Sequence, residues 1–136
     1  METISRDHTL KLLEKAYQET ERLKLPRDHR VDGRPKDRGA LVMRAKYRLD
    51  SYTTYKTPAG DAVSLGIIQG PDGDPFVSVH RRQSRGGRLL TIASDQFRLE
   101  DLEDATEFFL ATAVMISRHP HSWHERHPSD SYPVEP

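Results

Sequence analysis

Cysteine is absent from the 136-residue sequence. Its absence excludes disulfide bonds, thiolate zinc sites and thiol catalysis, and it is typical of proteins that stay in the reducing cytoplasm. Long apolar runs are absent too. None approaches the ~20 residues that a membrane-spanning helix requires, and residues 1–8 lack the apolar core of a signal peptide. We therefore expect a cytoplasmic protein without a membrane partner.

Motifs of the common enzyme classes are also lacking. The sequence contains no phosphate-binding loop of glycine and lysine, no dinucleotide fingerprint, no Gly-x-Ser-x-Gly elbow and no zinc-protease helix motif. Its histidines and carboxylates do not occur at spacings that require a catalytic pair. The sequence therefore predicts a protein that is not an enzyme, with no catalytic residue and no cofactor.

Histidine is concentrated near the C-terminus, at His119, His121, His124 and His127. Neutral imidazoles suit zinc, copper or nickel. The neighbouring prolines, however, prevent one regular helix from presenting all four rings, and no cysteine adds a ligand. We predict no metal site there, and we interpret residues 118–136 as a disordered His-rich tail.

Charge is balanced in total but segregated along the chain. The sequence has 21 basic and 21 acidic residues. Residues 27–48 carry eight Arg/Lys against three Asp, residues 80–88 carry four Arg and no acid, and residues 95–107 carry six acids and one Arg. Such separation favours a local anion-binding surface, although ordinary solvated faces that pair within the protein would give the same pattern.

The first part of the chain has the pattern of a helix followed by a linker. Leu10, Leu13, Tyr17 and Leu23 recur at helical spacing, and Pro26 ends the pattern because the residue before a proline avoids helical dihedrals. We predict a helix within residues 1–25. Residues 26–39 are polar and basic, and they predict a linker or a mobile arm.

Residues 40–92 have the pattern of an antiparallel sheet. Residues 40–49 alternate between apolar and mostly basic side chains, as a half-buried strand does, and the pattern continues or folds back through residues 52–57. Further strands are predicted at residues 62–69, 76–82 and 89–92, separated by turns rich in glycine and proline and by a basic hairpin tip. Together they predict about four strands.

A long amphipathic helix is predicted over residues 99–117. Its apolar stripe consists of Leu99, Leu102, Ala105, Phe109, Ala113 and Ile116. The acids in its first turns lie where the helix dipole favours negative charge, which explains the acidic cluster without a carboxylate site. Residues 40–117 are therefore predicted to form one α+β domain, an antiparallel sheet with this helix packed on one face and the N-terminal helix beside it.

A basic strand face beside aromatic residues indicates a binding function. Positive side chains hold the phosphates of single-stranded nucleic acid, and aromatic rings stack on its bases. Tyr47 alternates to the apolar side of its strand, so Tyr52 and Tyr55 are the better stacking candidates. The candidate binding residues are Arg44, Lys46, Arg48, Tyr52, Tyr55, Arg81, Arg82, Arg85 and Arg88.

The later part of this pattern resembles a known family. Residues 76–82 (Phe-Val-Ser-Val-His-Arg-Arg), residues 86–92 (Gly-Gly-Arg-Leu-Leu-Thr-Ile), Asp95-Gln96-Phe97 and the following helix resemble the positive-cofactor-four (transcriptional coactivator p15) type of single-stranded DNA-binding domain. The resemblance covers about residues 40–117. It implies a homodimer formed through the helix, with the seven basic candidates as phosphate contacts.

Two functions from different classes therefore remain open. The first is non-catalytic binding of single-stranded DNA or RNA through the basic sheet face, by a homodimer. The alternative is a regulatory adaptor that binds a protein partner through the N-terminal helix and the exposed face of the C-terminal helix. The two differ in salt dependence, because binding through phosphates weakens steeply as ionic strength rises and a hydrophobic interface responds little.

Overall fold

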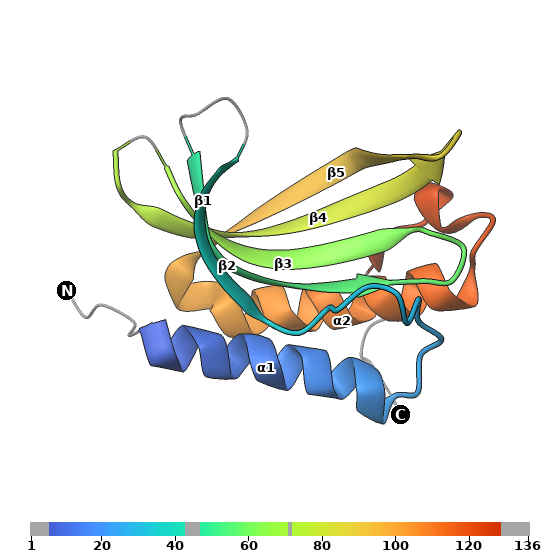
Figure 1. The fold of residues 1–136 in the computed structure, drawn as a ribbon, viewed down its shortest axis with the longest axis horizontal. Coiled ribbons are helices and arrows are strands. Elements are labelled where there is room, and N and C mark those ends of the chain that lie inside the picture. The colour runs from blue at the N-terminus through green and yellow to red at the C-terminus, as the bar shows by residue number, and fades with distance from the viewer. Residues whose placement is uncertain (1–5, 43–46, 71, 129–136) are drawn as a thin grey trace.

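The fold is an antiparallel sheet with two helices on one of its faces. The computed structural model describes residues 6–42, 47–70 and 72–128, with the backbone alone at residues 6, 37–42 and 47–49. The elements are α1 (Arg6–Arg22), β1 (Lys36–Val42), β2 (Tyr47–Lys56), β3 (Ala62–Gln69), β4 (Pro75–Arg85), β5 (Arg88–Arg98), the 3-10 helix η1 (Leu99–Asp101), α2 (Leu102–Arg118) and the 3-10 helix η2 (Trp123–Glu125). The strands form one sheet in the order β1-β2-β3-β4-β5 (Figure 1). The predicted α+β class is confirmed, with five strands where about four were expected.

Helix α1 confirms the predicted N-terminal helix. Its buried stripe consists of Thr9, Leu13, Ala16 and Thr20, at spacings of three and four. The stripe is rotated from the predicted one, because Leu10 and Tyr17 are only half-buried. Leu13 and Ala16 belong to the same core cluster as residues of α2 and the sheet, so α1 is docked on the domain.

The strand predicted over residues 40–49 is instead a hairpin. β1 and β2 pair in antiparallel fashion, with Ala40 opposite Leu49 and Val42 opposite Tyr47. Residues 43–46, between the two strands, lie outside the described part of the chain. Both arms of a hairpin keep the two-residue period, so the alternation alone did not reveal the reversal. In Figure 1 the last part of β1 and the first part of β2 bend away from the helices.

The segment predicted as a basic linker is fixed along β2. Its last residues belong to β1, which begins at Lys36. Before that point the carbonyl of Gly33 accepts hydrogen bonds from the Thr54 N–H (3.2 Å) and the Thr53 hydroxyl (2.7 Å). The N–H of Asp28 donates to the carbonyl of Lys56 at 2.9 Å. The interpretation of residues 26–39 as a mobile arm is therefore wrong for the described structure, because backbone bonds to β2 hold it.

The carboxylate of Asp28 is bound by both the backbone and the side chain of Arg30. This carboxylate accepts hydrogen bonds from the backbone N–H, Nε and Nη2 of Arg30 at 3.0, 3.0 and 3.1 Å. The bonds from the Arg30 side chain, followed by the bond from its backbone, lower the pKa of Asp28 to about 2, and partial desolvation opposes them.

Stability is therefore expected to fall as Asp28 is protonated. Because the folded-state pKa lies below the unfolded value of ~3.9, this carboxylate stabilises the fold above pH ~4 and loses its effect as the pH falls toward 2. We expect Asp28→Asn to lower the thermal midpoint at pH 7 and to match the parent protein near pH 2. A deficit that stays constant over this range would contradict the assignment.

Strands β4 and β5 are longer than predicted. The expected strand over 89–92 extends to Arg98, so Asp95 lies within β5. Ser, Asp and Gln at positions 94–96 have low strand propensity, so the sequence pattern did not predict that the strand continues through them. The register passes from Arg81 opposite Ala93 to Arg82 opposite Thr91. Ile92 is therefore the extra residue of a β-bulge.

Helix α2 confirms the predicted long helix, with η1 replacing its first turn. The predicted stripe from Leu102 to Ile116 is buried. The neighbouring Leu110, Val114 and Met115 are buried too, because α2 packs against both the sheet and α1. Neither helix among the described residues has the length and apolar character needed to cross a membrane.

The C-terminal segment is part of the fold as far as Pro128. Trp123 is fully buried and its indole N–H donates to Asp61 Oδ2 at 3.0 Å. The other carboxylate oxygen, Asp61 Oδ1, accepts the backbone N–H of Ser84 at 2.8 Å. The prediction of a disordered tail over residues 118–136 is therefore wrong for residues 118–128. The indole of Trp123 is buried in the core, and its N–H has a hydrogen-bond acceptor there. Residues 129–136 lie outside the described range.

Candidate nucleic-acid interface

The two faces of the sheet differ in what covers them. Val63, Leu65 and Ile67 of β3 belong to the core cluster with α2, as do Val77 and Val79 of β4. Leu65 lies opposite Val79 and Ile67 opposite Val77, and Val63 has the same parity in β3, so these residues share the face that the helices cover. The alternate residues of the same strands form the second face, which we call the outer face.

The outer face is defined by four rows across the strands. The rows are Ile68, Phe76 and Arg98; Lys36, Tyr52, Gly66, Ser78 and Gln96; Thr54, Ser64, His80 and Ser94; and Lys56, Ala62, Arg82 and Thr91. The residues contributed by β3 are small or aliphatic and buried, and the longer side chains stand on the neighbouring strands. Among the described side chains, the rows contain four cations and no carboxylate.

His80 is the centre of a hydroxyl network on the outer face. Its Nε2 lies 2.9 Å from Ser78 Oγ, and its Nδ1 lies 3.0 Å from Ser94 Oγ. In the same row, Thr54 Oγ1 and Ser64 Oγ are 2.9 Å apart. Burial, and then the positive charge of Arg82, lower the pKa of His80, and Asp95 opposes them. The imidazole is therefore neutral at pH 7, and it can donate one hydrogen bond and accept one.

Three of the four cations lie at the two ends of the outer face, and the half-buried Lys36 lies opposite Tyr52 in the second row. Lys56 and Arg82 are half-buried in one row, on either side of Ala62. Arg82 Nε is buried and without a hydrogen-bond partner. At the opposite end Arg98 is exposed and is paired with Glu100 (3.3 Å) and Asp101 (3.1 Å). The end with Lys56 and Arg82 is thus the one at which positive charge is available to an anion.

The four arginines of the predicted basic hairpin lie in different surroundings. Arg81 lies on the helix-covered face and pairs with Asp95 at 3.2 Å. Arg82 belongs to the outer face, as described above. Arg85 is exposed and donates from Nε to Gln83 at 2.6 Å, and Arg88 is exposed beside the turn. The structure brings Arg82, Arg85 and Arg88 to the surface and places Arg81 in an internal ion pair.

The predicted stacking residues are divided as well. Tyr52 lies half-buried on the outer face, beside Gly66. Tyr55 lies on the other face, only 2% exposed, and its hydroxyl donates to the carbonyl of Pro26. The alternation of β2 turns Tyr55 inward, so the structure corrects its assignment as a stacking residue.

The basic strand face of the prediction falls largely outside the described residues. Arg44 and Lys46 lie in the segment 43–46. For Arg48 the backbone alone is described, opposite Leu41 and Gln69. Their role stays a prediction.

Lys56, Phe76 and His80 were not among the predicted site residues. Phe76, His80 and Arg82 share one parity in β4, and that alternation could have shown that they face the same side. Lys56 has the parity of Tyr52 in β2, so the same alternation over residues 52–57 could have placed it on this face.

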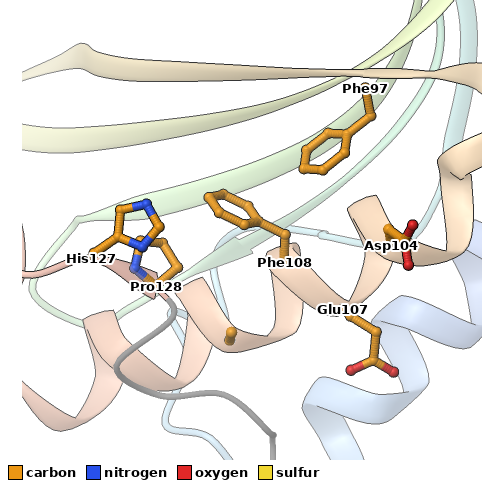
Figure 2. Close-up of a pocket in the computed structure, with 7 residues that line it drawn as sticks. Phe97, Asp104, Glu107, Phe108, His127 and Pro128 are labelled. Atoms are coloured by element: carbon orange, nitrogen blue, oxygen red, sulfur yellow. The ribbon is translucent and has the colours of Figure 1, made fainter.

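A small pocket lies on the helix-covered side, between β5 and α2. Its volume is about 210 Å³, which is below the usual range for small-molecule sites. Figure 2 shows Phe97 and Phe108 pointing toward one another, with His127 and Pro128 beside Phe108 and with Glu107 pointing away. The two phenyl rings are 5.6 Å apart, and the His127 ring lies 6.2 Å from Phe108. The pocket is a gap in aromatic packing that the C-terminal segment closes.

A second pocket lies between the two helices. It has a volume of about 330 Å³ and an apolar floor that includes Leu12, Ala16 and Leu110. Its rim carries Lys15 and the carboxylates Glu19, Glu103, Asp104 and Glu107. Within the described ranges, no group of three His, Asp or Glu side chains is placed to hold a metal ion.

Comparison with known proteins identified no relative of this chain. No protein-family model, no curated protein and no solved structure matches the chain.

Proposed function

We propose that the protein binds single-stranded nucleic acid, DNA or RNA, across the outer face. The observation that supports this proposal is the combination of Lys56 and Arg82 with the aromatic rings of Tyr52 and Phe76 on rows that contain no carboxylate. Phosphates need fixed cations and bases need stacking platforms, and this face offers both. The weak family resemblance of residues 40–117 points to the same activity.

Each part of the face has a role in the proposal. Lys56 and Arg82 contact phosphates, and the exposed Arg85 and Arg88 extend this positive end along the hairpin. Tyr52 and Phe76 stack on bases. Ser94 and Gln96, both exposed on β5, offer hydrogen bonds to base edges. Because no reaction is involved, affinity is set by counterion release and stacking.

Salt-dependent titration tests the roles of the two cations. Fluorescence anisotropy of labelled single-stranded oligonucleotides is measured between about 50 and 200 mM salt. We expect the double variant Lys56→Ala/Arg82→Ala to weaken binding about 10-fold or more, equal to ~1.4 kcal/mol. We also expect it to reduce the slope of log K against log salt by about 0.7 for each cation removed. Tyr52→Ala should weaken binding at every salt concentration and leave the slope unchanged.

The matched control removes two cations from the helix layer instead. Lys15 and Arg118 are both exposed on the helices, and Lys15→Ala/Arg118→Ala causes the same change in net charge. The proposal expects this variant to bind like the parent protein. Equal weakening by both double variants would mean that only net charge matters, and absence of binding at about 50 mM salt would overturn the proposal.

The adaptor function remains the second candidate. It is favoured by the pocket between α1 and α2, whose apolar floor and mostly acidic rim suit a basic amphipathic segment of a protein partner. We also propose, in line with the sequence, that the protein acts as a homodimer. The helices cover the sheet face opposite to the outer face, so the two candidate functions use different surfaces.

A further inference from the structure

Strand β5 combines two features that rarely occur together on a soluble protein. It is the last strand of the sheet, so within the described part of the chain one of its edges has no neighbouring strand. It also carries Leu89, Leu90 and Ile92, which are 39%, 41% and 37% exposed and are the exposed large hydrophobic residues of the described chain. An edge strand presents unpaired N–H and C=O groups, and natural proteins usually protect such edges with charged side chains.

The exposed stretch of β5 lacks that protection. No charged residue occurs between Arg88 and Asp95. The bulge at Ile92 bends the strand locally, but it does not remove the apolar side chains from the surface. Exposed apolar groups beside free backbone groups are the features by which one strand adds to another.

We propose that β5 pairs with β5 of a second copy of this chain, antiparallel and around a two-fold axis at Thr91. Charge favours a copy of the same strand, because β5 has Arg88 before its apolar stretch and Asp95 after it, although Asp95 is also paired with Arg81 of its own chain at 3.2 Å. Antiparallel pairing places Arg88 opposite Ser94 of the partner subunit, next to Asp95 of the partner subunit. Arg98, at the far end, is already paired with Glu100 and Asp101, so it adds little repulsion.

The same register brings the apolar side chains together. With Thr91 opposite its own copy, Leu90 of each chain lies opposite Ile92 of the partner subunit. Cross-strand apolar pairs stabilise a sheet, and a two-fold axis forms each pair twice. The dimer joins two sheets into one of twice the width. This inference does not rest on nucleic-acid binding, because it is argued from the edge and the apolar side chains of β5, although Thr91 and Ser94 also belong to the outer face.

Sedimentation equilibrium of the full chain tests this dimer. At tens of micromolar we expect a mass of twice 15.6 kDa. Leu90→Lys should raise the dissociation constant about 10-fold or more, with an unchanged circular dichroism spectrum because Leu90 is exposed. Ala59→Lys is the matched control, since it adds the same charge at an exposed turn residue away from β5, and it should sediment like the parent protein.

The absence of cysteine allows a direct test of the register. Oxidation of Thr91→Cys should give a covalent dimer, because directly opposed residues have Cβ atoms close enough for a disulfide after small shifts. Ala59→Cys should remain monomeric on a non-reducing gel. A protein that is monomeric at all concentrations, a dimer that Leu90→Lys leaves intact, or equal cross-linking at both positions would overturn the proposal.

Discussion

Replacing Trp123 with alanine is expected to lower the free energy of unfolding by about 3–5 kcal/mol. The indole is fully buried, and its N–H donates to Asp61 at 3.0 Å. The substitution removes a large apolar side chain from the core and leaves a buried carboxylate oxygen without its donor. Urea denaturation followed by circular dichroism measures the loss, since the variant has no tryptophan fluorescence.

Two further variants separate the parts of this effect. Trp123→Phe keeps much of the apolar volume and loses the hydrogen bond, so its cost should be clearly smaller. His121→Ala changes an exposed neighbour in the same segment and should cost almost nothing. A loss below about 1 kcal/mol for Trp123→Ala would mean that residues 118–128 do not contribute to the cooperative unit.

The second large effect concerns two adjacent phenylalanines of α2. Phe109→Ala is expected to cost about 3–5 kcal/mol, because Phe109 is fully buried in the core cluster of the sheet and both helices. Phe108→Ala should cost less than half as much, because Phe108 is only partly buried beside the pocket near Phe97. The same urea titration applied to both variants compares equal chemical changes one position apart.

The comparison of these two positions tests the orientation of α2. Successive residues on a helix are separated by about 100° of rotation, so the ratio of the two losses reports which side faces the sheet. Equal losses, or a larger loss at Phe108, would mean that the helix is rotated from the described position.

Much of the fold was predictable because it depends on repeated patterns. The stripe from Leu102 to Ile116 fixed α2, and the apolar run over 62–69 fixed β3 with the observed bounds. These patterns succeed because burial on one side imposes a period on many residues. The stripe of α1 was predicted with a rotation, since Ala16 and Thr20 are small enough to allow close packing and carry little hydropathy signal.

The parts that were not predicted depend on single contacts. Nothing periodic signals that Gly33 would hold the preceding segment to β2, or that Asp61 would hold Trp123. The candidate site was predictable where its residues follow from strand alternation. Tyr52 and Arg82 follow from strand alternation, and the same alternation places Tyr55, three residues after Tyr52, on the opposite face.

The order of the strands also affects how the chain folds during synthesis. Each strand pairs with the one made just before it, so the sheet can grow hairpin by hairpin as the chain leaves the ribosome. Its apolar face, however, is covered mainly by α2, which is made after all five strands. The nascent sheet therefore carries an uncovered apolar face until residue 118 has emerged, and closure by Trp123 comes later still, across 62 residues of chain from Asp61.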